Sequence, residues 1–546
     1  MGTFDYVIVG AGSAGCTLAN RLSADPSIRV CLIEAGKKDS SFLIRMPAGV
    51  GQLIKEAGPH NWGFWTEPQE HMGGRKLYWP RGKGWGGSSS INGMIYIRGH
   101  ARDYDQWRQM GLDGWGFADV LPYFRRSEHY EGGADGFHGA GGPLWVEDSP
   151  LDNPIHRAFI EAGIEAGFKH TNDFNGAEQE GFSHYQRTIR DGERWSASYA
   201  YIHPVEALRP NLTIQSTGLV TKVIVENGKA TGVEVVSGPG QRPERIEATS
   251  EVIVCAGAVQ SPQLLMLSGI GPADEIQKHG IEVQADLKDV GQNLQDHLDV
   301  LVLQEINQPL SAYSKQKSWR KYKVALDYLL RKKGPGRDQF LQAGAFLKSR
   351  EGLDRPDIQL HMVNAMSLNH ANDAVEKDGF MVHSCQLRPE SRGHIGLRSA
   401  DPFDTPIIDP NYLATEEDRR AMREGLKMVR EILKQEALRP YRGPEYGPGE
   451  KVKTDDEIDA YIRETGETIY HPVGTVRMGT DKDAPLDGQL RVRGVDSLRV
   501  IDASVMPTLI GGNTNAPTIM IAEKASDMIL GKPAMAPEQP DLVGAV

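Results

Sequence analysis

Short apolar runs and a glycine-rich turn alternate at the start of the chain. Residues 4–9 form a β-branched apolar run that predicts a buried strand, and residues 29–33 form a second one. Between them, residues 13–23 place their apolar side chains on one face, which predicts a helix. The pattern therefore predicts a strand–helix–strand unit that begins with the first residues.

The hydrophobic pattern changes twice further along. The sequence predicts short antiparallel strands at residues 211–214, 222–225 and 232–236, with a turn at Asn227-Gly228, then a core strand at 251–257 and a helix at 260–267. From about residue 311 to 453, charged helical stretches at 321–331 and 416–433 alternate with strand candidates at 357–362, 381–387 and 394–398. After residue 454, glycine-rich turns and a strand-then-helix pattern return, at 498–502 and 516–530.

The turn after the first strand reads Gly10-Ala11-Gly12-Ser13-Ala14-Gly15, a G-x-G-x-x-G motif. It follows a strand, opens a helix and has Glu34 about twenty residues on, which is the dinucleotide-binding context. Gly10 permits the tight turn, Gly12 lets the backbone approach a pyrophosphate, and Gly15 lets helix and strand pack closely. Glu34 can accept hydrogen bonds from both ribose hydroxyls and would repel a 2′-phosphate, which argues against NADP. The motif does not choose between FAD and NAD.

These patterns predict an α/β part combined with an α+β part. We expect a Rossmann-like nucleotide-binding domain assembled from the separate segments 1–155, 206–310 and 454–535. Residues 156–205 and 311–453 would form a substrate-binding domain with an antiparallel sheet and helices, and residues 536–546 a C-terminal tail.

Charge and composition narrow the class of partner. The net charge of -12 makes the chain a poor partner for polyanions, so we expect no nucleic acid. The four cysteines have no metal-binding or redox spacing, which predicts buried thiols, a reducing compartment and no metal site. No apolar run reaches the roughly 18 residues of a membrane span, and a strand at Phe4 leaves no room for a signal peptide. We expect a cytoplasmic protein, with peripheral contact to the inner membrane left open.

Two further stretches carry candidate chemistry. Residues 79–99 are rich in Gly and Ser but interleaved with Trp, Ile and Met, which favours an ordered loop over a flexible linker. His471 lies in a short loop before a proline, and a helix is predicted to start at residue 515 with Asn515 as its N-cap. By itself, one histidine is more often structural than catalytic, and Asn513 and Asn515 would be capping residues.

Four regions together resemble the glucose–methanol–choline (GMC) family of FAD oxidoreductases over nearly the full length. They are the glycine motif with Glu34, residues 82–92, residues 257–271, and the His471 loop with Asp502-Ala503 and Asn513-Thr514-Asn515. Residues 96–99, 293–297, 391–393 and 513–518 make the chain similar to the bacterial choline dehydrogenase and aliphatic alcohol dehydrogenase branch.

The resemblance implies the cofactor and its contacts. The residues that fall on FAD-binding positions are Gly10, Gly12, Ser13, Gly15, Glu34, Ala35, Gly87, Asn92, Val220, Ala256, Asp502, Ala503, Asn515 and Thr518. Family members with covalently attached FAD have a histidine just before the loop asparagine, where this chain has Ile91. We therefore expect non-covalent FAD.

The resemblance also implies the reaction. His471 matches the family's catalytic histidine and Asn513 its partner. We expect neutral His471 to take the hydroxyl proton of a primary or secondary alcohol, Asn513 to donate a hydrogen bond to its oxygen, and the hydride to pass to flavin N5. Quinone, another carrier or oxygen would reoxidise the flavin. A choline dehydrogenase proper, an oxygen-using alcohol oxidase and a non-redox FAD-containing lyase of the same family stay open as alternatives.

Overall fold

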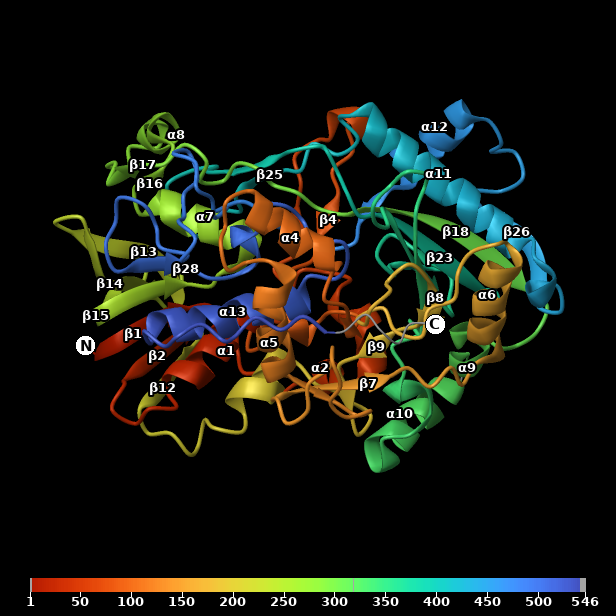
Figure 1. Ribbon diagram of the computed structural model, residues 1–546, viewed down its shortest axis with the longest axis horizontal. Helices are drawn as coiled ribbons and strands as arrows, with labels where there is room; N and C mark the ends of the chain where they lie inside the picture. Colours follow the sequence, from red (N-terminus) through yellow and green to blue (C-terminus); the bar gives the residue numbers. More distant parts are fainter. Residues whose placement is uncertain (1, 318, 541–546) are drawn as a thin grey trace.

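The computed structural model describes residues 2–317 and 319–540. Two seven-stranded sheets organise the molecule, and Figure 1 shows the first on the left and the second on the right. The predicted combination of a Rossmann-like part and a part with an antiparallel sheet is confirmed. Within the predicted tail, residues 541–546 lie outside the described part of the chain.

The first sheet is built on the predicted strand–helix–strand unit. Its strand order is β12 (Leu212–Ser216), β2 (Val30–Glu34), β1 (Thr3–Val9), β15 (Glu244–Val254), β14 (Lys229–Val236) and β13 (Leu219–Glu226), and β28 (Leu498–Val500) pairs with β15. The strands β12, β2, β1, β15 and β28 are parallel, whereas β13 and β14 form the predicted antiparallel hairpin. Because α1 (Ser13–Leu22) packs on β1 and β2, and α13 (Asn515–Ile529) packs on α1, these strands are buried apolar runs.

One strand of this sheet corrects the sequence-based expectation. β12 was predicted as part of an antiparallel set, but it pairs with β2 in parallel. A long crossover connects β2 to β12, and strands joined by a crossover rather than a hairpin can run parallel.

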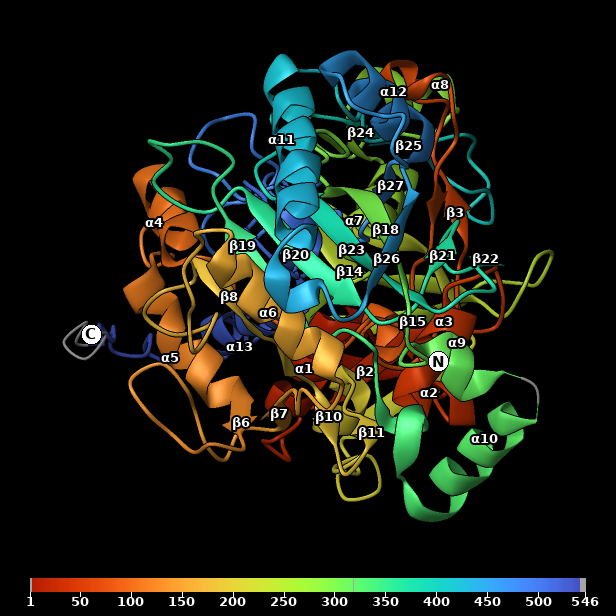
Figure 2. The same cartoon turned by 90° about the vertical axis from the view of Figure 1, so that its right-hand side faces the viewer.

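The second sheet is antiparallel. Its order is β26 (Arg442–Gly447), β18 (Leu298–Ile306), β23 (Gly379–Gln386), β20 (Ile358–Val363), β19 (Ala343–Leu347) and β8 (Gly181–His184), and β27 (Glu467–Thr468) pairs with β18. The predicted helix α11 (Glu416–Leu433) and α6 (Pro154–Glu165) pack against it; Figure 2 shows α11 in front of the strands. α11 begins after Thr415, whose side chain accepts a hydrogen bond from the backbone of Asp418, and it buries an apolar face.

One strand that the sequence did not predict and one that it did predict lie in places that local patterns do not indicate. β18 belongs to the second sheet, although the sequence assigned residues 206–310 to the nucleotide-binding domain. β24 (His394–Gly396) pairs with β25 (Ile407–Asp409) outside the large sheet. The domain boundaries themselves stay a prediction.

The Gly/Ser stretch at residues 79–99 is ordered. It runs from β4 (Tyr78–Trp79) through a single 3₁₀ turn at Gly87–Ser90 to β5 (Ile95–Tyr96), and most of it is buried. The other predicted helices are α7 (Gly257–Leu267), which begins three residues before the expected start, and α10 (Arg320–Arg331). None of the helices in residues 2–317 and 319–540 is both long and apolar enough to cross a membrane.

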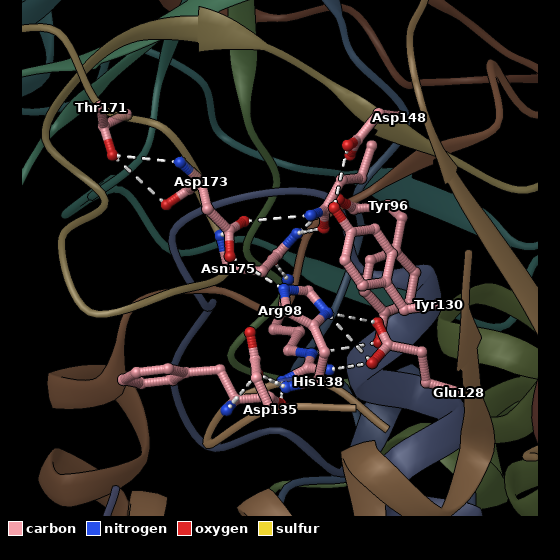
Figure 3. A network of polar contacts seen from close by, with 12 residues as sticks. Tyr96, Arg98, Glu128, Tyr130, Asp135, His138, Asp148, Thr171, Asp173 and Asn175 are labelled. Carbon is pink, nitrogen blue, oxygen red and sulfur yellow. Dashed lines mark hydrogen bonds and ion pairs between the residues drawn. The ribbon is translucent and has the colours of Figure 1, made fainter. Parts of the chain in front are cut away.

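A buried charge network fixes the segment that follows β5. Arg98 pairs with Glu128 at 2.7 Å, and His138 lies between Glu128 at 3.1 Å and Asp173 at 2.8 Å. Figure 3 shows these residues within the network. Burial alone would lower the pKa of His138, but its hydrogen bonds to Asp173 and Glu128 raise that pKa to about 9. The network joins residues 96–98 to a distant loop and thereby supports the end of the glycine-rich stretch.

Candidate active site

A cavity of about 1130 Å³ is lined by residues of both sheets. It exceeds the roughly 300–1,000 Å³ of most small-ligand sites, so it has room for a dinucleotide together with a substrate. Fifteen of the sixteen predicted catalytic and FAD-binding residues line it: Gly10, Gly12, Ser13, Glu34, Ala35, Gly87, Asn92, Val220, Ala256, His471, Asp502, Ala503, Asn513, Asn515 and Thr518. The sixteenth, Gly15, is buried in α1 and is not a lining residue.

The three glycines of the first turn have different surroundings. Gly10 has a φ of +102°, which favours glycine, and a Cβ there would lie 2.6 Å from the carbonyl oxygen of Cys255. A Cβ on Gly15 would lie 1.9 Å from the carbonyl oxygen of Gly10, so this glycine allows the helix to pack on the strand. A Cβ on Gly12 would meet no protein atom closer than 4.0 Å. The space beside Gly12 therefore belongs to the cavity, as a closely approaching phosphate requires.

Three helices point their N-termini at the cavity. Residues at the starts of α1, α7 and α13 all line it, namely Ser13, Gly257 and Asn515. The positive ends of the helix dipoles favour anionic groups there. The predicted N-cap at Asn515 is wrong: Thr514 is the cap residue, and the side chain of Asn515 accepts a 2.6 Å hydrogen bond from Ser13 Oγ. Asn515 thus joins the starts of α13 and α1.

Glu34 is more fully occupied than the sequence suggested. Its Oε2 atom accepts from the backbone N–H of Ala11 at 2.9 Å, and its Oε1 atom accepts from Gly36 at 2.8 Å and Gly84 at 3.0 Å. A carboxylate has about four acceptor positions, so Glu34 has room for one ribose hydroxyl rather than two. The difference arises because Gly84, from the distant glycine-rich stretch, packs on the first turn.

Other polar side chains of the cavity hold its walls in place. Asp502 accepts hydrogen bonds from the backbone of Gly257 at 2.8 Å and from Ser261 Oγ at 2.5 Å, and so fixes the start of α7. Asn92 Oδ1 accepts from the buried Arg194 at 2.7 Å. An open glycine turn, converging helix N-termini and a free acceptor position on Glu34 together fit the pyrophosphate and ribose of FAD.

Hydrogen bonds to Asp296 hold the loop that contains His471 in place. The backbone N–H of His471 donates to Asp296 Oδ1 at 2.8 Å, and Thr468 Oγ1 donates to the other oxygen of Asp296 at 2.5 Å. Tyr470 has a φ of +73°, an uncommon conformation for a bulky residue. The imidazole ring of His471 is buried, with Nε2 3.2 Å from Nδ2 of Asn513. The structure therefore brings the two predicted catalytic residues together.

A chain of hydrogen bonds fixes the proton on His471. His297 Nε2 lies 3.3 Å from the carbonyl oxygen of Leu387, which can only accept, so this nitrogen carries a proton. Burial lowers the pKa of His297 to about 3 and lowers that of His471 well below 6.5, so both rings are neutral. His297 Nδ1 is then an acceptor, and His471 Nδ1, 3.0 Å away, donates to it. This leaves the lone pair of His471 on Nε2, beside Asn513.

The amide of Asn513 is oriented by a further contact. Gln359 Nε2 donates to Asn513 Oδ1 at 3.2 Å, so the amide nitrogen of Asn513 faces His471. A hydroxyl oxygen between the two residues would meet one acceptor and one donor. This is the arrangement that general-base catalysis with stabilisation of a developing alkoxide needs.

Sequence reasoning missed several residues of this half of the cavity. His361 lines the cavity with both ring nitrogens unpartnered among the described residues, and burial lowers its pKa well below 6.5. Asp299 also lines it; its Oδ2 atom pairs with His383, while Oδ1 is buried without a partner. One signal was present: His297 and Asp299 are two residues apart at the start of a strand, so their side chains point to the same face.

Comparisons with known proteins identify the family that the chain resembles. Two family models described as GMC oxidoreductase match residues 4–299 and 389–522. The chain is 47% identical over 542 residues to the mitochondrial choline dehydrogenase of Homo sapiens, covering 97% of this chain and 90% of that protein. It is also 47% identical over 534 residues to the oxygen-dependent choline dehydrogenase of Brucella anthropi, covering 97% and 96%.

Solved structures show the same fold. Pyridoxine 4-oxidase from Mesorbium loti superposes with a TM-score of 0.88 at 35% identity, covering 97% of this chain and 100% of that one. Formate oxidase superposes with a TM-score of 0.91 at 28% identity, covering 97% and 98%.

Proposed function

This chain belongs to the GMC oxidoreductase family, and we propose that it oxidises an alcohol whose hydroxyl group binds between His471 and Asn513. FAD is its cofactor, and when bound it supplies the acceptor for the hydride of the alcohol carbon. His471 carries the proposal, because its unprotonated Nε2 atom lies in the cavity beside an amide donor.

The cavity residues divide between the parts of the cofactor. Gly12 and Ser13 would hold the pyrophosphate at the start of α1, and Glu34 would accept from a ribose hydroxyl. Asn515 at the start of α13 would hold the flavin end, where a helix dipole favours negative charge. Ile91 has no nucleophilic atom and packs against Ile44 and Leu53, which supports non-covalent attachment.

The proton step follows from the hydrogen-bond chain. His471 Nε2 takes the hydroxyl proton, while the N–H of Asn513 donates to the oxygen as negative charge develops on it. His297 keeps the proton of His471 on Nδ1 and does not touch the alcohol. Asp296 holds the His471 loop in place through the backbone N–H.

The preferred substrate class is a primary alcohol with an apolar body. Leu301, Val363, Met366 and Met381 line the substrate half of the cavity and offer only apolar surface. Choline is the second candidate, because Asp299 lines the same half with one buried oxygen unpaired and the named relatives are choline dehydrogenases. Oxygen, a quinone or another carrier would complete the cycle.

Anaerobic mixing of the purified holoprotein with primary alcohols, secondary alcohols and choline tests the proposal. We expect the flavin absorbance to bleach with one class, and His471→Ala to slow bleaching by roughly 10²- to 10⁴-fold while the bound flavin spectrum stays. Bleaching by choline alone, lost in Asp299→Asn, would select the second candidate. A flavin that no alcohol bleaches would contradict alcohol oxidation. Admitting oxygen or a quinone afterwards identifies the acceptor.

A further inference from the structure

Helix α10 and the residue before it expose an apolar face. Trp319, Tyr322, Leu326, Leu329 and Leu330 are all more than half exposed. Their spacing of three or four residues places them on one side of the helix. Exposed leucines are ordinary when they are scattered, but five large apolar or aromatic side chains on adjacent turns form a contiguous patch.

The opposite side of α10 attaches the helix to the molecule. Tyr328 is buried, packs edge-on against Phe42, and donates a 3.1 Å hydrogen bond to the carbonyl of Arg45. Just beyond the helix, Lys332 pairs with Glu193 at 2.7 Å. Figures 1 and 2 both show α10 projecting at the periphery of the molecule. The apolar side of α10 therefore faces outward, because the opposite side of the helix packs against the rest of the molecule.

The charge around this patch is opposite to that of the whole chain. Residues 315–333 carry one acidic residue, Asp327, and the basic residues Lys315, Lys317, Arg320, Lys321, Lys323, Arg331, Lys332 and Lys333. Within the described residues, no carboxylate pairs with Arg320, Lys323, Arg331 or Lys333. The rest of the chain must be strongly acidic, because the net charge is -12. The positive charge is thus concentrated beside the apolar face.

We propose that the outer face of α10 binds the surface of an anionic lipid membrane. An amphipathic helix with Trp and Leu on one face and Lys and Arg beside it has the composition of helices that lie in the lipid interface. Lysine is depleted from the centres of protein interfaces, so the same composition fits a protein partner less well. Electrostatic attraction would orient the acidic body away from the lipid.

Docking through α10 would also bring one wall of the cavity close to the lipid surface. The preceding helix α9 (Ala312–Gln316) contributes Ala312 and Tyr313 to the cavity lining, and Lys317 follows them. This wall would then lie beside the lipid surface, from which an apolar alcohol or a quinone could enter. That consequence rests on the proposed function, whereas the docking itself does not.

Co-sedimentation of the full-length holoprotein with vesicles tests the docking without measuring activity. The vesicles contain phosphatidylcholine alone or mixed with phosphatidylglycerol. We expect the protein to pellet with the mixed vesicles only, and Leu329→Asp/Leu330→Asp to lower the partition coefficient at least about tenfold. Arg331→Gln/Lys333→Gln should lower it roughly fivefold per charge, because each basic residue contributes about 1 kcal/mol at such a surface.

Leu208→Asp is the matched control, because Leu208 is 77% exposed and lies far from α10 in the sequence. It should pellet like the unmodified protein. Equal pelleting with both vesicle types, no pelleting with either, or unchanged pelleting of the Leu329/Leu330 variant would each overturn the proposal. A dimer in sedimentation velocity that the same variant converts to monomer would also overturn it, since a second copy would then be the occupant.

Discussion

His471 can act as a base only if its ring proton sits on Nδ1, because Nε2 must face the substrate oxygen. His297 enforces this, since its own proton is held by the carbonyl of Leu387. We expect His297→Ala to lower kcat about 10- to 100-fold with little change in KM, and His297→Asn to recover part of it, because an amide oxygen can accept from Nδ1. Stopped-flow flavin reduction over a pH range measures this; equal rates in both variants and the unmodified protein would contradict it.

The attachment of the flavin depends on Ile91. This side chain lines the cavity and offers carbon atoms only. Denaturing the yellow protein with acid should therefore release essentially all flavin into the supernatant. Flavin that stays with the precipitated chain would show that a different residue forms a covalent bond.

At the scale of elements, the first turn allows folding and binding to be separated. Gly12→Ala places its methyl group into open space, so the fold should survive while the approach of the pyrophosphate is blocked. Gly15→Ala forces a methyl group against the Gly10 carbonyl and should cost roughly 1–3 kcal/mol or more in stability. Circular dichroism and FAD titration of both variants test the contrast. Tight FAD binding by Gly12→Ala would contradict the assignment of this turn to the pyrophosphate.

The elements also show what the sequence could predict. The positions of α1, α11 and the β13–β14 hairpin follow from local periodicity and an Asn-Gly turn, which depend on neighbours in the chain, although both strands of the hairpin begin three residues before their predicted starts. The direction of β12 depends on a long crossover, and the membership of β18 in the second sheet depends on partners some eighty residues away, so neither has a local signal.

The candidate site follows the same division. The spacing of the glycine motif and Glu34 predicts a dinucleotide site by itself, whereas a catalytic role for His471 is predicted only by the family resemblance. His361 and Asp299 come from strands of the second sheet and reach the cavity through tertiary packing alone, and Gln359 of the same sheet contacts Asn513 in the same way. Even Asn515, whose place at the start of a helix was predicted, contacts Ser13 rather than capping the helix, because α1 lies beside it.

At the scale of the whole molecule, buried histidines should make the fold sensitive to acid. Burial lowers the pKa of His156 to about 4, that of His297 to about 3 and that of His370 to about 4, and it lowers those of His361 and His471 well below 6.5. Below pH 6.5 these histidines are protonated in the unfolded chain but stay neutral in the folded protein. Stability is therefore present above that pH and is lost as the pH falls, by about 1.4 kcal/mol per unit for each histidine.

Six carboxyl groups of the described residues act in the opposite direction, because burial raises the pKa values of Glu34, Glu147, Asp296, Asp299, Glu467 and Asp502. Burial raises the pKa of Asp296 to about 6 and that of Glu467 to about 7, so the folded state gains protons as the pH falls through those values. His138 and His383, whose carboxylate partners raise their pKa values, contribute little here, because the unfolded chain also protonates these histidines as the pH falls below 6.5. With His60 and His100 included, burial lowers the pKa of seven histidines of the described residues, one more than the six carboxyls, so we expect the midpoint of thermal unfolding to fall between pH 6.5 and pH 5.

His156 allows this prediction to be isolated from the active site. Both of its ring nitrogens are buried without partners among the described residues, and it does not line the cavity. Replacing His156 with Phe should lower by one the number of protons that the chain takes up on unfolding at acidic pH. The pH dependence of the thermal midpoint should then be shallower, while alcohol oxidation at pH 7 stays unchanged. Differential scanning calorimetry of the holoprotein at half-unit pH steps measures both slopes. An equal slope in His156→Phe and the unmodified protein would contradict the lowered pKa of His156, because the carboxyl groups are the same in both proteins.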